Sequence, residues 1–136
     1  MAKVDMEQAS WQDVLQAIKE SNINYSKDYD IYTYYHYDKG NIVGVVYGWF
    51  YDRCLYIDIV FVSAEYRGKG IATSMLKKVI QEIKSKDIDN IIVELVKYKG
   101  KYLLANILVR LGFCLHSLYY ILRQRVIYYM PLEKEY

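Results

Sequence analysis

One segment, residues 57–86, most limits what this chain can fold into, because an apolar run passes through a glycine-bearing turn into an amphipathic helix. The turn is the hexapeptide Arg67–Ala72, which contains Gly68 and Gly70. Beyond it, apolar side chains recur at helical spacing on one face and charged side chains occupy the other. A turn of this kind presents free backbone N–H groups at the positive end of the helix dipole. The segment therefore predicts a phosphate-binding site.

The remaining sequence predicts a sheet with flanking helices. A first helix is expected over about residues 6–20, and an irregular loop over 21–30. Later elements are expected in this order: strands 31–37, 42–51 and 54–62, helix 69–86, strand 91–96, helix 101–111 and strands 113–122 and 126–132. The strand–helix–strand order from 54 to 96 predicts a right-handed βαβ unit with parallel strands.

The predicted fold class is therefore α+β, with a mixed, mostly antiparallel sheet, one βαβ crossover and flanking helices. A single domain is expected over residues 1–136. Within the strand 54–62, alternation predicts Ile57, Ile59 and Phe61 on one face and Asp58 on the other. Ligands in such sheets bind at the carboxyl ends of the parallel strands.

Composition excludes several classes of protein. The 54% hydrophobic content and single proline indicate a folded chain, and a net charge of +2 is too small to imply nucleic acid. The two cysteines and two histidines lack metal-ligand spacing, so no metal is expected. No apolar run approaches 18 residues and no signal peptide is seen, so a cytoplasmic protein with reduced thiols and no membrane partner is expected.

A family resemblance follows from two short motifs. Residues 62–72 resemble the acetyl-CoA signature of the GNAT N-acetyltransferases, in which Arg or Gln is followed by two residues, Gly, one residue, and Gly or Ala. Arg67, Gly70 and Ala72 fill this pattern. The run Leu111–Phe113 after a helix is similar to a second landmark of that family. Together the motifs imply the GNAT fold and acetyl-CoA as co-substrate.

The order of the predicted elements also resembles the order of elements in the GNAT family over about residues 40–132. Two other phosphate-binding motifs fit the sequence less well. A Rossmann fingerprint needs a third glycine where Thr73 stands, and a P-loop needs Ser or Thr where Gly70 follows Lys69. Both are disfavoured.

The resemblance assigns residues to the cofactor site. Backbone amides of Gly68–Thr73 would hold the diphosphate, and the backbone of Val60–Val62 would run beside the pantetheine arm. Arg67 or Lys69 would add charge-assisted contacts. The full expected set is Val60, Phe61, Val62, Arg67, Gly68, Lys69, Gly70, Ile71, Ala72 and Thr73.

Acetyl transfer to an amine requires a base, and a proton donor assists the leaving thiolate. The candidate bases are Glu94 and Asp58, either of which could act through water. Many family members place a tyrosine as acid where this chain has Leu108. Tyr102 or Tyr98 could replace it, or the thiolate could leave without an acid.

The expected function is acetyl transfer from acetyl-CoA directly to a primary amine, which disfavours Cys114 as a nucleophile. Only about 30 residues precede Ile31, so we expect an open acceptor groove suited to a peptide or protein. Tyrosines could line it, at positions 25, 29, 32, 34 and 35.

One alternative function is a CoA-binding sensor without catalysis. The other is a nucleic-acid-binding module, which is disfavoured because the lysines that would bind nucleic acid are explained more simply as a solvent-exposed helix face. The expected partners are acetyl-CoA and an amine acceptor, small molecule or protein. No nucleic acid is expected, and a homodimer stays open.

Overall fold

The computed structural model describes residues 9–96, 101–117 and 125–131. Its elements, in chain order, are α1 (Trp11–Tyr25), β1 (Asp30–Asp38), β2 (Asn41–Tyr51), β3 (Cys54–Val62), the short 3-10 helix η1 (Ala64–Tyr66), α2 (Ile71–Lys84), β4 (Asn90–Val96), α3 (Lys101–Arg110), β5 (Cys114–Ser117) and β6 (Arg125–Pro131).

The strands form one mixed sheet in the order β1-β2-β3-β4-β6-β5. Within the described chain the β3–β4 pair is parallel, and the other neighbouring pairs are antiparallel. Helix α2 connects β3 to β4, which makes the expected βαβ unit. The predicted α+β fold, with a mostly antiparallel sheet and one crossover, is confirmed.

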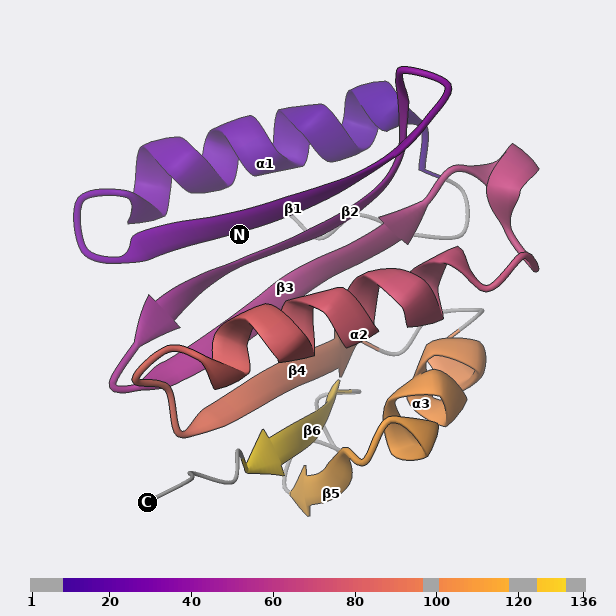
Figure 1. Cartoon of the computed structure of the whole chain (residues 1–136). Coiled ribbons are helices and arrows are strands. Elements are labelled where there is room, and N and C mark those ends of the chain that lie inside the picture. Colours follow the sequence, from indigo (N-terminus) through magenta and orange to yellow (C-terminus); the bar gives the residue numbers. More distant parts are fainter. Residues whose placement is uncertain (1–8, 97–100, 118–124, 132–136) are drawn as a thin grey trace.

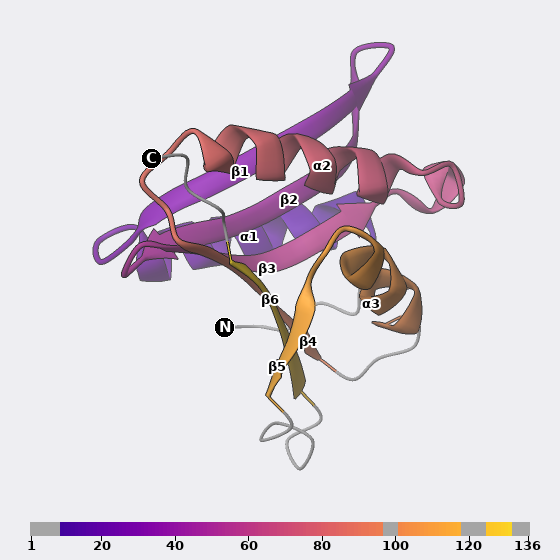
Figure 2. The same cartoon turned by 60° about the horizontal axis from the view of Figure 1, so that its bottom comes forward.

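Helices cover the two faces of the sheet unequally (Figure 1). On one face, α1 packs Val14 and Ile18 against side chains of β2 and β3 that include Val45 and Phe61. On the other face, α2 and α3 pack together over a larger core that extends to β4. Of the side chains that the structure describes, none from β4 joins the cluster beneath α1. Figure 2 likewise shows α1 behind the first three strands, away from β5 and β6.

Helix α1 begins and ends later than the sequence predicts. It starts after Ser10, whose side chain accepts a hydrogen bond from the Asp13 N–H (3.2 Å), while the Asp13 carboxylate accepts one from the Ser10 N–H (3.0 Å). This reciprocal cap fixes the first turn. The predicted loop is wrong over residues 21–25, because Ser21 is fully buried against the sheet and the helix continues to Tyr25.

Strand β3 contains a bulge that the alternation pattern does not predict. Tyr47 of β2 lies opposite Ile59, and the next residue, Gly48, lies opposite Ile57. Asp58 is therefore an extra residue in β3, and the side chains after it change face. Ile57 packs beneath α2, whereas Ile59 packs beneath α1. The expectation that these two isoleucines share one face is wrong.

The bulge leads to a first prediction, for Gly48→Ala. A methyl group on Gly48 would overlap the carbonyl oxygen of Tyr56, which is backbone and cannot swing away. We expect the free energy of unfolding to fall by about 2 kcal/mol or more, as in other overpacked sites. Urea unfolding measures the change, with Gly44→Ala as the control, because there the methyl group meets the flexible end of Met75. An unchanged midpoint for Gly48→Ala would contradict the close approach of Gly48 to the Tyr56 carbonyl.

Candidate functional site

The two parallel strands separate at their carboxyl ends and form a fork. Their pairing ends at Ile57 and Val93, although β3 continues to Val62 and β4 to Val96. Beyond this point β3 stays paired with β2, and β4 stays paired with β6. Figure 2 shows the two strands diverging. Backbone groups on the facing edges of the fork are therefore available to an extended ligand.

The glycine-bearing turn lies at the end of β3, beside the mouth of the fork. Gly68 and Gly70 both adopt left-handed backbone, with φ of 75° and 78°, and Gly70 is the N-cap of α2. A Cβ on either glycine would meet no atom within 4 Å. The Ser74 N–H donates to the Gly70 carbonyl (3.0 Å), so the N–H groups of residues 71–73 precede the helical hydrogen bonds. This open backbone fits a diphosphate group.

The two basic side chains of the turn lie differently. Arg67 Nε donates to the Val62 carbonyl oxygen (2.9 Å), and its guanidinium carbon lies 5.6 Å from the centroid of the Phe61 ring. Lys69 is exposed, and its Nζ lies 5.2 Å from the centroid of the Tyr66 ring. Arg67 thus braces the end of β3, whereas Lys69 is the better placed of the two to contact a phosphate.

Asp58 lies where the fork opens. It is the first residue of β3 beyond the last pair with β4, and its Oδ2 is buried. Burial, and then the charge of Asp58, raise the pKa of Tyr47 to about 12. The Tyr47 hydroxyl donates to Oδ1 of Asn22 on α1 (2.7 Å). The charge of the Asp58 carboxylate therefore influences a side chain in the cluster beneath α1.

The raised pKa of Tyr47 gives a prediction for alkaline solution. An unfolded tyrosine ionises near pH 10, whereas folded Tyr47 holds its proton to about pH 12. Its contribution to stability is therefore complete below about pH 10 and is lost as pH rises through about 12. We expect Tyr47→Phe to flatten the loss of unfolding free energy over this interval, measured by urea unfolding. The exposed Tyr37→Phe is the control, and equal slopes in the Tyr47 variant and wild type would refute the assignment.

Glu94 occupies the matching position on the other arm of the fork. It follows Val93 directly and pairs with Ile127 of β6. The backbones of Asp58 and Glu94 thus both lie one residue beyond the last β3–β4 pair. Tyr102 lies in the first turn of α3. The structure describes only the backbone of Glu94 and Tyr102, and Tyr98 lies outside the described residues.

Leu108 is part of the hydrophobic core, and its hydrocarbon side chain cannot act as a general acid. Its side chain is fully buried in the cluster beneath α2 and α3. Its carbonyl accepts a hydrogen bond from the Phe113 N–H (2.9 Å), which closes the end of α3 around Gly112. The expected second landmark is therefore a helix end that packs against the βαβ unit. The side chain of Cys114 lies outside the described part of the structure.

The tyrosines expected to line an acceptor groove are separated in space. Tyr25 and Tyr29 stack on Trp49, with ring centroids 4.9 and 6.2 Å away. Tyr32 instead lies on the α2 face, where its hydroxyl donates to Glu82 (2.8 Å). They do not line one groove, because they divide between the two faces of the sheet.

Sequence reasoning missed the bulge at Asp58 and a hydrogen bond from Tyr66 to Asp38. An acidic residue within an apolar strand, opposite a strand glycine, was the available signal for the bulge. Among the described residues there is no group of three or more His, Cys, Asp or Glu that could hold a metal ion. The same residues include no helix long and apolar enough to cross a membrane.

Comparison with known families identifies the class. The model of the acetyltransferase (GNAT) family matches residues 3–113. The match spans more than half of the chain, so this protein belongs to the GNAT acetyltransferase family. No curated protein matches the sequence at a significant level.

Solved structures of low sequence identity share the fold. A GNAT-family acetyltransferase from Desulfovibrio desulfuricans superposes with a TM-score of 0.72 at 12% identity, over 89% of this chain and 80% of that one. The ribosomal-protein-S18-alanine N-acetyltransferase from Escherichia coli gives 0.70 at 13%, over 94% and 93%. A GNAT acetyltransferase from Elizabethkingia anophelis with acetyl-CoA bound gives 0.66 at 17%, over 84% and 83%.

Proposed function

We propose that this protein transfers an acetyl group from acetyl-CoA directly to a primary amine on a peptide or protein. One observation carries the proposal: the β3–β4 fork opens beside the glycine-bearing turn at the start of α2. A ligand whose diphosphate bound the turn could extend its arm into the fork. Membership of the GNAT family supports acetyl-CoA as that ligand.

The residues of the fork supply the remaining requirements. Acetyl-CoA supplies a thioester that the amine attacks, with release of the CoA thiol. The edge of β3 from Val60 to Val62 faces away from β2 toward the fork, and its backbone would orient the pantetheine amides and the acetyl carbonyl. Asp58 or Glu94 would accept a proton from the acceptor ammonium, directly or through water. Their positions on opposite arms of the fork support this role.

The uneven helical cover supports a peptide or protein acceptor. Helix α1 packs over β1, β2 and β3, and among the described side chains it does not reach β4. The α1 side of β4 would then form one wall of an open approach to the fork. The Escherichia coli structure similar to this chain carries the name of an enzyme that acts on a ribosomal protein, which is consistent with a protein acceptor.

Acetyl transfer to a panel of peptides and small amines tests the proposal. Mass spectrometry should detect an added acetyl group on the amine of one or more peptides, with release of free CoA. A Gly70→Val preparation made in parallel should lose this activity, which would assign it to the chain itself. Activity confined to small polyamines or aminoglycosides would refute a peptide or protein acceptor.

A second candidate is a CoA-binding sensor without catalysis. The observation that favours it is Leu108, a buried apolar side chain at the position where many GNAT enzymes carry a tyrosine. A sensor would bind acetyl-CoA and would show no transfer to any acceptor. Asp58→Asn and Glu94→Gln would then have no turnover to lose, which separates the sensor from the enzyme.

A further inference from the structure

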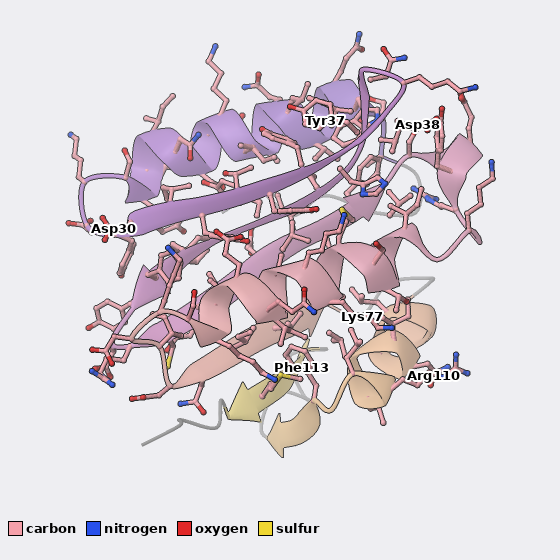
Figure 3. The ribbon with its side chains drawn as sticks, viewed as in Figure 1. Asp30, Tyr37, Asp38, Lys77, Arg110 and Phe113 are labelled. Atoms are coloured by element: carbon pink, nitrogen blue, oxygen red, sulfur yellow. The ribbon has the colours of Figure 1, made fainter. Side chains whose placement is uncertain are left out.

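A hydrogen bond ties the glycine-bearing turn to a distant hairpin. The Tyr66 hydroxyl at the end of η1 donates to Oδ2 of Asp38 (3.1 Å), although 28 residues separate the two. Asp38 is the last residue of β1, at the tip of the β1–β2 hairpin (Figure 3). The Asp38 carboxylate also raises the pKa of Tyr66, chiefly through this hydrogen bond. The hairpin tip therefore holds the residue that precedes Arg67 and the turn.

Two further contacts hold Tyr66 and its segment in place. The Ser63 N–H donates to the Val43 carbonyl (2.9 Å), which extends the attachment of the segment to β2. The half-buried Tyr66 ring packs against the core beneath α2. Tyr66 is thus fixed at the ring by packing and at the hydroxyl by Asp38.

The same tyrosine contacts the basic side chain of the turn. Lys69 Nζ lies 5.2 Å from the centroid of the Tyr66 ring, a distance typical of cation–π contacts. Among the described residues Lys69 has no ion pair with a carboxylate. The ring can therefore orient the ammonium without neutralising it. The charge stays available for an anionic ligand.

Contacts from outside the turn are required to hold its backbone in one conformation. Lys69 stands between Gly68 and Gly70, the two residues with left-handed backbone. Glycine has the most backbone freedom of any residue, so a glycine-bearing turn does not enforce its own conformation. Ordering a flexible backbone and a long lysine on binding would cost affinity, and prior ordering removes that cost.

We propose that Asp38 and Tyr66 are positioning residues for the diphosphate of acetyl-CoA. They hold Lys69 and the amides of the turn in the arrangement that binds the diphosphate. This inference rests on the proposed cofactor site. It makes the β1–β2 hairpin, which lies outside the signature motif, a determinant of affinity for CoA.

The alternative is a hydrogen bond that only stabilises the fold. Such a bond would affect the melting temperature and leave the affinity of the folded protein unchanged. A positioning role instead predicts weaker binding of CoA and a higher KM for acetyl-CoA, with kcat and the acceptor KM little changed. These readouts separate the two explanations.

The experiment measures CoA binding by calorimetry, and KM and kcat where turnover is found, for Tyr66→Phe, Asp38→Ala and the double variant. We expect each single variant to raise the Kd for CoA about 3- to 10-fold, the change that corresponds to the net contribution of one ordinary hydrogen bond. The double variant should bind no more weakly than the worse single variant, because both remove one interaction. Asp38→Asn, which keeps an acceptor oxygen, should retain more affinity than Asp38→Ala.

Tyr37→Phe is the matched control, since Tyr37 precedes Asp38 and is 58% exposed. It should bind CoA as the wild type does. Wild-type affinity in Tyr66→Phe and Asp38→Ala, or additive losses in the double variant, would overturn the positioning role while leaving the proposed function intact. Absence of CoA binding by the wild-type chain would overturn both. The predicted result is a shared loss of CoA affinity in the single and double variants, with unchanged binding by Tyr37→Phe.

Discussion

Gly70→Val is expected to weaken acetyl-CoA binding by about 100-fold or more, equivalent to about 2.7 kcal/mol, while the chain still folds. Gly70 has φ of 78°, a conformation that is strained for any β-branched residue. Its Cβ would meet no protein atom within 4 Å, so neighbouring atoms leave room for a side chain there. The side chain would instead occupy the space over the first amides of α2. Calorimetric titration with acetyl-CoA measures the loss.

Gly70→Asn provides the matched comparison, because asparagine tolerates left-handed backbone better than valine does. It should therefore unfold closer to the wild-type temperature and lose less affinity than Gly70→Val. Thermal melting of both variants checks that the chain remains folded. Wild-type affinity in a folded Gly70→Val protein would show that the turn does not bind the diphosphate.

Removing the proposed catalytic base is expected to have the second large effect. Asp58 and Glu94 lie at matching positions on the two arms of the fork, one residue beyond the last pair. An amide replacement keeps the shape of either side chain and removes its ability to accept a proton. We expect the variant of the true base, Asp58→Asn or Glu94→Gln, to lose about 10²- to 10⁴-fold in kcat. Its affinity for acetyl-CoA should stay within about 3-fold of wild type, since general-base catalysis acts on the amine.

The dependence of kcat on pH identifies which carboxylate acts. The wild-type rate should fall as pH is lowered, because the base becomes protonated. The variant of the true base should lose this dependence, whereas the other variant should keep it. Wild-type kcat in both variants would exclude a carboxylate base at the fork and favour deprotonation of the amine in solution.

Local features of the fold could be predicted from the sequence because their causes are local. The apolar face of α2, formed by Leu76, Val79 and Ile83, follows from helical spacing and is buried as expected. The turn before it follows from glycine chemistry, with Gly68 and Gly70 both in left-handed conformation. The parallel pairing of β3 and β4 follows from the helical crossover between them, because such a connection returns the chain to the end of the sheet where β3 began.

Other features depend on contacts between distant segments and could not be predicted. The bulge at Asp58 is a property of its register with β2, which residues 54–62 alone do not specify. Helix α1 extends to Tyr25 and buries Ser21, so tertiary packing overrides the polar composition of residues 21–25. The hydrogen bond between Tyr66 and Asp38 joins residues that no sequence pattern connects.

The bulge also lies next to the candidate site. The extra residue at Asp58 increases the local twist of β3, as bulges do, at the point where β3 leaves β4. The turn from Gly68 to Gly70 then lies at the end of the same strand. A carboxylate with one buried oxygen, an open strand edge and the proposed anion-binding turn thus occur within one short segment of the chain.

Titration of the full chain with acetyl-CoA, followed by a structure of the complex, tests whether the turn and the fork together bind the cofactor. We expect a single site with a Kd of about 1–100 µM, within the usual range for enzyme substrates. The diphosphate should contact the amides of residues 68–73, and the thioester should lie between β3 and β4. Absence of binding at high micromolar acetyl-CoA, or acetyl-CoA bound away from the fork, would contradict this expectation.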